Sequence, residues 1–478
     1  MKCKKVILLL AMSLIFQCFF SSCTTKDDTP LTEESSVQQT EEDLLGYLPD
    51  KQFGDTFDML VRLQDVNDNY ITEQQEEPTL IQENVYNSYA EVARRFDVDF
   101  RFTGLDGYSS GQAQFVNTIL SDIQAGGSFD AVAPSYYFGV SLVIQGCYLD
   151  LNQISVFDFS KPWWYDGFNA TMELNNAMYV CAGEFDVGHL KNTYAMTFNE
   201  TIINSYGLES PYQMYDENRW TLENLLIMAE TVGDISGTGK VGLAVTRKSA
   251  DCFFQGSGLR FVDKDGNGEL YVSKYSDQAE TLYQTLSNYI GKESNVCKYG
   301  GSPDADFLQG ETLFAAMTLG SMTKLIDSGF DYGVAVYPKY NADQKEYYST
   351  TAGASVFALT KTTPNTEMSA TVLEALCAHF HEKVTPAIFE NLMQGRVAKN
   401  PEMAAMLETI RDTLFYDFGF VWSASLGNIA TFTSFIETGS YEAMSTWYQA
   451  IGGGYETKLD EFLTDYTKVP EKLQAGSN

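Results

Sequence analysis

The chain alternates short apolar runs with amphipathic stretches, the order that α/β folds require. Apolar residues recur at helical spacing in residues 80–95, which predicts a helix with one buried face. Strand-like runs flank this helix, and a second helix leads into a third strand. We expect strands at Phe57–Leu63, Val98–Thr103 and Phe129–Ala133, and the second helix at 111–125. This βαβαβ order predicts parallel strands joined by right-handed crossovers.

The same alternation continues in the later part of the chain. The predicted helices are 221–232, 276–290, 366–382 and 401–415, and the predicted strands are Val241–Val245, Tyr332–Val336 and Ser355–Leu359. Thr221 is a suitable N-cap for the first of these helices. No repeat with a period of 20–50 residues is visible, which disfavours a solenoid or a propeller.

The first 22 residues have the pattern of a signal peptide. Three lysines precede an apolar run from Val6 to Phe20, which as a helix would rise about 22 Å, less than the ~30 Å hydrocarbon core of a membrane. The run ends in Phe20-Ser21-Ser22-Cys23, which resembles the lipobox of bacterial lipoproteins except that Phe20 stands where Leu is usual. We therefore expect lipid on Cys23, with an uncleaved anchor or a plain secretory signal as alternatives.

Residues 23–48 are rich in Thr, Ser, Gln and acidic side chains. Such a segment buries too little apolar surface to offset its ordering entropy, so it predicts a flexible tether. The expected location is the extracytoplasmic side of the cell membrane, with the lipid as the anchor.

Charge and cysteine usage narrow the function classes. The 478 residues include 31 Lys+Arg against 64 Asp+Glu, a formal net charge of −33, which disfavours nucleic acid as a partner. Only three histidines occur, and no CxxC or CxxH spacing is present, so we expect no metal site. Five cysteines remain after Cys23, and their spacing does not reveal whether any pair forms: Cys147, Cys181, Cys252, Cys297 and Cys377.

Two glycine-containing motifs match the sequence of known ligand sites but lack the context that those sites need. Gly237–Gly242 spells GxGxxG, but a predicted helix precedes it and a strand follows, the reverse of a dinucleotide site, so we expect a turn and no cofactor. Asp263–Gly268 begins like a calcium loop, but Lys274 stands where the bidentate Glu is needed, so we expect a hairpin. His379 and His381 are two residues apart on a helix and therefore point to different sides.

A series of short blocks occurs in a characteristic order along the chain. The blocks are Gln124–Val132, Gln145–Leu151, Phe198–Glu200, Tyr206–Leu208, Trp220–Leu225, Phe307–Thr312, Asp331–Pro338 and Thr351–Val356. Their order resembles that of the family 1 extracellular solute-binding lipoproteins, the substrate receptors of ABC importers, which include maltose-binding-type sugar receptors. The resemblance covers about residues 50–430, and Trp163-Trp164 is similar to a tryptophan pair in larger members from anaerobic Gram-positive bacteria.

The resemblance implies an α/β, two-lobed type II periplasmic-binding-protein fold with discontinuous lobes and an inter-lobe cleft. Lobe 1 would comprise residues 50–155 and 347–395, and lobe 2 residues 156–346 and 396–470. The implied function is that of a monomeric, non-enzymatic receptor, which captures an oligosaccharide by lobe closure and delivers it to an ABC permease. The alternatives are a secreted carbohydrate-active enzyme with a carboxylate pair, and a peptide or polyamine receptor of the same fold.

Aromatic residues near strand ends or lobe crossings are the first candidates for ligand contact, because flat rings suit the faces of sugars. Carboxylates and hydroxyls nearby would bind sugar hydroxyl groups. The alternative for each ring is packing in the core or at the hinge. The candidate ligand-binding residues are Tyr136, Tyr137, Trp163, Trp164, Glu184, Asp186, Ser355 and Trp422.

Overall fold

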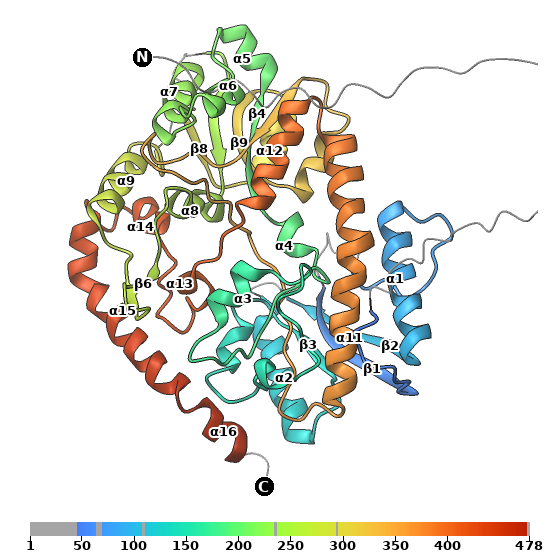
Figure 1. Cartoon of the computed structure of the whole chain (residues 1–478). Coiled ribbons are helices and arrows are strands. Elements are labelled where there is room, and N and C mark those ends of the chain that lie inside the picture. Colours follow the sequence, from blue (N-terminus) through green and yellow to red (C-terminus); the bar gives the residue numbers. More distant parts are fainter. Residues whose placement is uncertain (1–44, 64–68, 108–109, 234–236, 293–294, 476–478) are drawn as a thin grey trace, which may run out of the picture. The chain divides into compact units, whose positions relative to one another are not determined.

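The computed structural model of the chain describes residues 45–63, 69–107, 110–233, 237–292 and 295–475. The predicted signal peptide, Cys23 and the predicted tether as far as residue 44 lie outside these ranges. The elements follow the α/β order expected from the hydrophobic pattern and surround two separate sheets (Figure 1).

The first sheet contains three parallel strands in the order β2-β1-β3, which confirms the predicted βαβαβ beginning. The strands are β1 (Asp55–Leu63), β2 (Val98–Asp106) and β3 (Ala131–Ala133), joined by α1 (Leu80–Phe96) and α2 (Gln112–Ala125). Thr79 and Gln82 form a capping box that starts α1. The side chains of Val85, Tyr89 and Val92 then form the buried face of that helix, as the helical spacing predicted.

The second sheet has five strands in the order β10-β4-β9-β5-β8. Its strands β5, β8 and β9 are parallel, whereas β4 runs antiparallel to both β9 and β10. The strands are β4 (Tyr194–Asn199), β5 (Val241–Val245), β8 (Cys297–Tyr299), β9 (Thr312–Thr318) and β10 (Tyr332–Ala335). Gly242 lets α7 (Leu222–Gly233) approach β5 closely, because a Cβ there would lie 2.2 Å from the Ala229 carbonyl oxygen.

The GxGxxG motif and the motif that begins like a calcium loop have the structures that their sequence context predicted. Gly237–Gly242 connects α7 to β5, with the helix first and the strand second. Asn267 and Gly268 lie in the turn of a hairpin between β6 (Val262–Lys264) and β7 (Leu270–Val272).

The remaining α-helices are α3 (Asp166–Met172), α4 (Gly188–Lys191), α5 (Glu200–Tyr206), α6 (Pro211–Asp216), α8 (Arg247–Gly256), α9 (Asp277–Ser287), α10 (Pro303–Leu308), α12 (Pro401–Asp412), α13 (Phe418–Val421), α14 (Thr433–Glu437) and α16 (Val469–Ala475).

Three chain segments connect the region around the first sheet to the region around the second sheet. We call them the crossing segments: residues 187–194, 349–357 and 414–418. They are bridged to one another at Thr193–Thr351 and at Ser349–Leu414. The predicted strand Ser355–Leu359 is not a regular strand, because its residues form only isolated bridges to two segments. Ser355 and Ala358 bridge to residues 132–135, Phe357 bridges to Cys181, and no continuous ladder forms.

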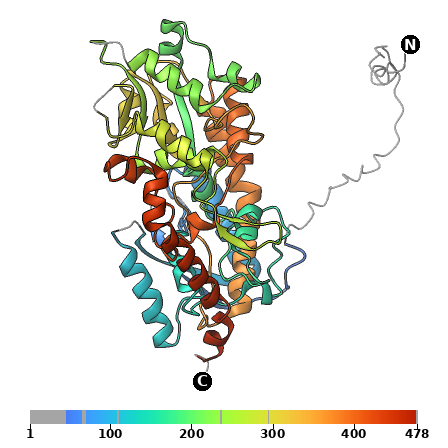
Figure 2. The ribbon, with the colours of Figure 1, turned by 90° about the vertical axis from the view of Figure 1, so that its left-hand side faces the viewer.

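Two long helical segments each contact both sheet regions. The helix predicted at 366–382 begins as α11 (Thr366–His379) and continues with π-helical geometry to Val397. Pro386 lies in this continuation, where its missing N–H removes a regular helical hydrogen bond. The second segment is α15 (Met444–Tyr466) followed by α16, which runs from α9 to the neighbourhood of Ile144 and Ala177 (Figures 1 and 2).

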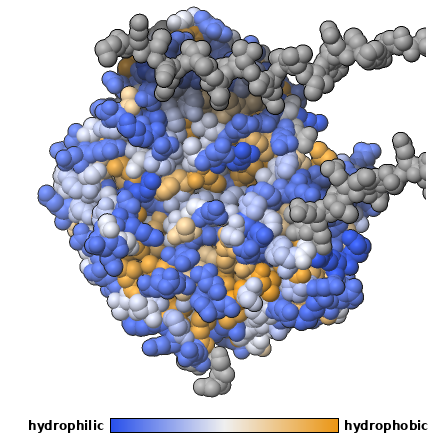
Figure 3. All heavy atoms as spheres, viewed as in Figure 1, coloured by the Kyte–Doolittle hydropathy of each residue, from blue (hydrophilic) through white to orange (hydrophobic). Residues whose placement is uncertain are grey.

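Hydrophilic residues cover most of the face shown in Figure 3, with smaller apolar areas between them. Among the described residues, no helix combines the length and the apolar character that crossing a membrane would need. The five cysteines outside the signal region are buried thiols and are not bonded to one another.

Candidate functional site

The carboxyl ends of β1, β2 and β3 meet at one edge of the first sheet, the usual place for ligands in parallel α/β sheets. Arg62 lies at this edge near the end of β1, and Ser135, Tyr136 and Tyr137 follow β3. The Arg62 side chain is 6% exposed and donates from Nε to the Ser355 hydroxyl at 3.3 Å. A cavity of about 10 Å³, space for a single water, lies beside Arg62 and Ser135.

Tyr136 and Tyr137 connect this edge to segments of the chain in the region of the second sheet. Tyr136 is buried and donates from its hydroxyl to the Thr351 carbonyl oxygen at 3.0 Å. Tyr137 is partly exposed and lies 3.4 Å from the Ser423 hydroxyl. Both rings contact Phe420, with ring centroids 5.9 Å apart in each case. These contacts place the two tyrosines where the two sheet regions meet.

Helix α8 faces the same place from the second sheet, because it starts directly after β5 ends at Val245. A capping box of Thr246 and Ser249 starts the helix. The first two helical residues, Arg247 and Lys248, are exposed cations. Although part of Lys248 is exposed to solvent, protein atoms crowd around its amine, and this desolvation, followed by repulsion from Arg62 and Arg247, lowers the pKa of Lys248. Three positive charges from the two sheet regions therefore lie near one another in a strongly acidic protein.

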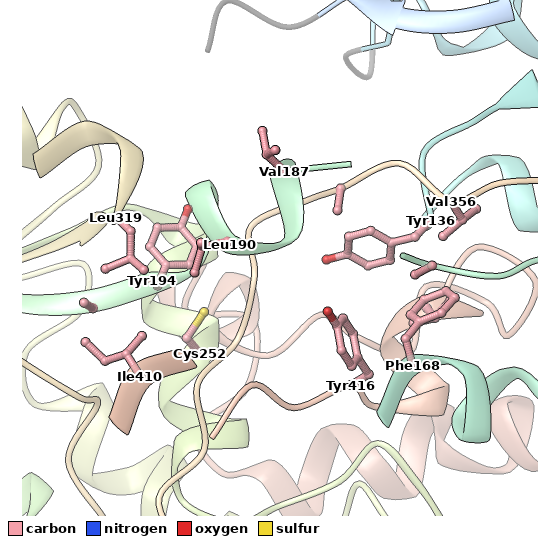
Figure 4. Close-up of a cluster of buried hydrophobic side chains, with 14 of the residues drawn as sticks. Tyr136, Phe168, Val187, Leu190, Tyr194, Cys252, Leu319, Val356, Ile410 and Tyr416 are labelled. Atoms are coloured by element: carbon pink, nitrogen blue, oxygen red, sulfur yellow. The ribbon is translucent and has the colours of Figure 1, made fainter. Parts of the chain in front are cut away.

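Buried side chains from both regions pack together at this junction (Figure 4). Tyr136, Phe168 and Tyr416 lie on one side of the picture, and Tyr194 and Cys252 on the other. The junction is thus an apolar core crossed by a few polar groups, and the crossing segments run through it.

A buried hydrogen-bond chain passes through the crossing segments. His189 Nε2 lies 3.0 Å from the Ser355 carbonyl oxygen, which can only accept, so Nε2 carries the proton. His189 Nδ1 is then the acceptor for the Tyr416 hydroxyl at 2.8 Å in the neutral ring. Burial lowers the pKa of His189, which favours this neutral form. Asp186 is also buried and accepts from the Ser355 backbone N–H at 2.5 Å.

A larger cavity, of about 420 Å³, lies at the Tyr416 end of this chain. It shares no lining residue with the small cavity beside Arg62. Its walls come from the segment before and within α3, from Glu184, from the crossing segments and from the end of α12. The lining side chains that carry charge or an aromatic ring are Trp164, Tyr165, Asp166, Glu184, Arg411, Asp412 and Tyr416.

Trp163 and Trp164 are both tied to one buried carboxylate. The indole N–H groups of the two rings donate to Glu374, at 2.8 Å from Trp163 and 3.2 Å from Trp164. Tyr47 stacks on Trp163 and donates its hydroxyl to the same carboxylate at 2.9 Å. Burial raises the pKa of Glu374, while these donors lower it. This arrangement gives the tryptophan pair a clear packing role in the first-sheet region.

Trp422 is 1% exposed and packs against α15. Its ring centroid is 4.7 Å from that of Phe462, and it also contacts Phe418 and Tyr466. Its indole N–H has no hydrogen-bond partner among the described residues.

The predicted site residues thus fall into three groups. Tyr136, Tyr137, Asp186 and Ser355 gather at the junction, Trp164 and Glu184 line the larger cavity, and Trp163 and Trp422 lie in packed surroundings. Their part in ligand binding stays a prediction. His379 and His381 contact different partners, Glu91 and Glu184, as their spacing indicated.

Sequence reasoning missed several residues at the junction. Arg62 could have been found, because a single cation inside an apolar strand is unusual. The Arg247-Lys248 pair directly after a predicted strand was a similar signal. His189 and Tyr416 left no such signal, because their roles depend on contacts between segments more than 200 residues apart.

No protein-family model matches the sequence, and no curated protein matches it. Solved structures do match over most of the chain. The galacto-N-biose/lacto-N-biose I-binding protein of an ABC transporter from Bifidobacterium longum matches with a TM-score of 0.55 and 13% identity, over 86% of this chain and 98% of that one. The extracellular solute-binding protein from Staphylococcus aureus in complex with maltose matches with 0.54 and 14%, over 86% and 97%. A cyclo/maltodextrin-binding protein complexed with maltotetraose matches with 0.54 and 13%, over 87% and 98%.

These matches show the fold. The chain has the mixed α/β, two-lobed fold of ABC-transporter solute-binding proteins, as the resemblance implied, and it accounts for nearly the whole length of each matched structure. The sheet of the second lobe is mixed parallel and antiparallel.

Proposed function

We propose that this chain is a solute receptor that captures an oligosaccharide between its two lobes and delivers it to an ABC permease without chemical change. The observation that carries the proposal is the match over 97–98% of the length of sugar-binding proteins solved in complex with maltose, lacto-N-biose and maltotetraose. A shared fold alone does not determine the ligand, which depends on the side chains at the site.

The junction of the lobes fits such a role. The sugar would lie at the carboxyl edge of the first sheet, with the half-buried Tyr137 ring as the stacking surface. Closure would bring α8 and the Ser423 region against the same ligand, since both already lie near Tyr136 and Tyr137. Trapping a ligand by movement about crossing segments is a common hinge mechanism.

Binding and turnover can be separated in one experiment. A thermal-shift screen of the purified protein with oligosaccharides, peptides and polyamines should select one or more sugars, since a ligand at 100 times its Kd adds about 2.7 kcal/mol to stability. Chromatography after long incubation should return the sugar intact. A screen in which only peptides stabilise the protein would contradict the carbohydrate proposal. Turnover that a single Asp or Glu substitution abolishes would instead support the secreted enzyme.

The lobe boundaries and the membrane anchor are part of the same proposal. The predicted lobes were residues 50–155 with 347–395 and residues 156–346 with 396–470. We place the first boundary instead at the first crossing segment, because Trp163 and Trp164 are bonded to Glu374 in the first-sheet region. Residues 50–186 with 347–395 and residues 187–346 with 396–470 would then form the lobes, and residues 23–48 would tether them to the membrane. Lipid on Cys23 would hold the receptor beside its permease. The Cys23→Ala variant should therefore appear in the soluble fraction, whereas unchanged membrane association would contradict lipid anchoring on Cys23.

A further inference from the structure

The 420 Å³ cavity is separated from the proposed sugar site by the crossing segments. Tyr416 lines the cavity, its hydroxyl donates to His189, and His189 in turn contacts Ser355, whose hydroxyl accepts from Arg62 at the other side. The buried side chains between the two places leave no shared lining residue. The volume lies in the range of sites that hold small organic ligands.

Three flat rings line the cavity. Trp164 and Tyr165 come from the chain before α3, and Tyr416 comes from a crossing segment. Each ring is held in place by its neighbours. Trp164 is bonded to Glu374, Tyr165 lies 4.7 Å from the His189 ring, and Tyr416 lies 5.2 Å from the Phe168 ring. Rings held in this way can present faces or edges to a ligand at little entropic cost.

The charges on the cavity wall are predominantly negative. Arg411 is the cation of the wall, and its Nε donates to Asp412 at 3.1 Å while its guanidinium lies 4.5 Å from the Phe389 ring centroid. This pair offsets itself and leaves the carboxylates of Asp166 and Glu184. The charge of Glu184 is partly offset by His381, because its hydrogen bond to Glu184 raises the pKa of that histidine.

Glu184 is the more informative of these two carboxylates. Its side chain is only 12% exposed, and its Oε1 accepts from His381 Nδ1 at 2.9 Å. Its Oε2 is buried and has no hydrogen-bond partner among the described residues. A buried carboxylate oxygen without a donor is costly, so a positive charge held beside this carboxylate would be favourable.

We propose that this cavity is a second ligand site, which takes a small organic ammonium ion. The aromatic wall would attract the cation through its ring faces, and Glu184 and Asp166 would supply the opposite charge. A ring-lined pocket with nearby carboxylates suits a desolvated ammonium group better than a neutral polyol, because both the ring quadrupoles and the acids favour positive charge.

The charge requirement can be tested with two molecules of nearly the same shape. Choline carries a quaternary ammonium, and 3,3-dimethylbutan-1-ol replaces its nitrogen with carbon. Titration calorimetry on the full chain should show saturable choline binding, with the neutral alcohol at least tenfold weaker. Equal affinity for both molecules, or no binding of choline, would overturn the proposal.

The location can be tested by filling the cavity. A Cβ on Gly167 would meet only Tyr416 Cδ2, at 3.8 Å, so Gly167→Leu places its side chain toward the cavity without a backbone clash. This variant should lose choline binding. Ala170→Leu is the matched control, because residue 170 is an exposed position of the same helix. Retained choline affinity in a folded Gly167→Leu protein would contradict the site.

A second variant keeps the test decisive if Gly167→Leu does not fold. Asp166→Asn preserves shape and removes charge from the same wall, and it should weaken choline binding at least fivefold with the sugar affinity unchanged. Choline binding unaffected by Asp166→Asn would argue against the proposal. Loss of sugar binding in either variant would identify the cavity as part of the sugar site and overturn the inference. Sugar binding without any ammonium binding would reject this inference and leave the proposed function standing.

Discussion

Trp422 is enclosed by α15, whereas Tyr137 keeps part of its ring exposed at the lobe junction. The difference allows a prediction for each ring. Trp422→Ala should reduce the free energy of unfolding by about 3–5 kcal/mol, as for other buried large rings. Tyr137→Ala should cost less stability but weaken sugar binding by about 1–3 kcal/mol, or roughly 5- to 150-fold in Kd.

Urea denaturation and calorimetric titration of the two variants would measure both quantities. Trp422→Phe is the milder control, because it keeps a ring and removes the indole N–H that lacks a partner. If the Tyr137→Ala variant binds sugar normally, Tyr137 does not contact the sugar. If the Trp422→Ala variant keeps its stability, Trp422 is not packed in the core.

Asp417 should make stability depend on pH. Burial raises its pKa to about 7, against the lowering effect of two backbone donors, Phe261 and Phe420. Between about pH 4 and pH 7 the folded state then binds a proton that the unfolded state has lost. Stability should therefore fall as pH rises through this window, by at most about 1.4 kcal/mol per pH unit for one group.

The Asp417→Asn variant isolates this effect. The stability difference, wild type minus variant, should decrease as pH rises from 4.5 to 7 in denaturation curves measured at several pH values. An increase would mean that the two backbone N–H donors outweigh burial and that the pKa of Asp417 is lowered.

Individual residues were the least predictable level of the structure. The sequence pattern marks Trp163 and Trp164 as notable but cannot reveal that Glu374, more than 200 positions later, accepts from both indoles. Likewise, nothing near Glu184 in the sequence indicates that one of its oxygens is left without a donor.

Helix α15 contains three consecutive glycines, at positions 452–454, and their different surroundings allow a test. A Cβ at Gly453 or Gly454 would meet nothing within 4 Å, whereas one at Gly452 would lie 2.9 Å from the Tyr448 ring. Gly453→Ala and Gly454→Ala should therefore each stabilise the fold by about 0.5–1 kcal/mol, because alanine loses less backbone entropy in a helix.

Gly452→Ala serves as the matched control within the same helix, and it should give no such gain. Melting temperatures of the three variants would settle the comparison. Equal stabilisation by all three would show that the Tyr448 ring moves freely, and destabilisation at positions 453 and 454 would contradict a continuous helix.

Elements were predicted well where the local pattern is complete. The buried face of α1 and the parallel strands β1–β3 follow directly from periodicity and βα order. Ser355–Leu359 has the composition of a strand, but its residues pair singly with two separate segments, at 132–135 and at Cys181, so composition could not show how it pairs. The helix after residue 382 was missed because Pro386 normally ends a helix.

At the scale of the whole molecule, the two-lobed fold was predictable because many weak sequence blocks occur in a family-like order. The contacts between the lobes were not, since they depend on pairs such as Tyr137 with Ser423 that lie 286 residues apart. In the proposed receptor, the ligand would be selected by the few side chains that both lobes bring to the junction.

Calorimetric titration of oligosaccharides into the purified protein, with chromatography of the ligand afterwards, would show whether this chain binds carbohydrate and releases it unchanged. We predict saturable binding of at least one oligosaccharide at one site, with the sugar recovered intact and the affinity reduced by Tyr137→Ala. The absence of binding to every oligosaccharide tested, or recovery of cleaved sugar, would contradict the account of this chain as a carbohydrate receptor.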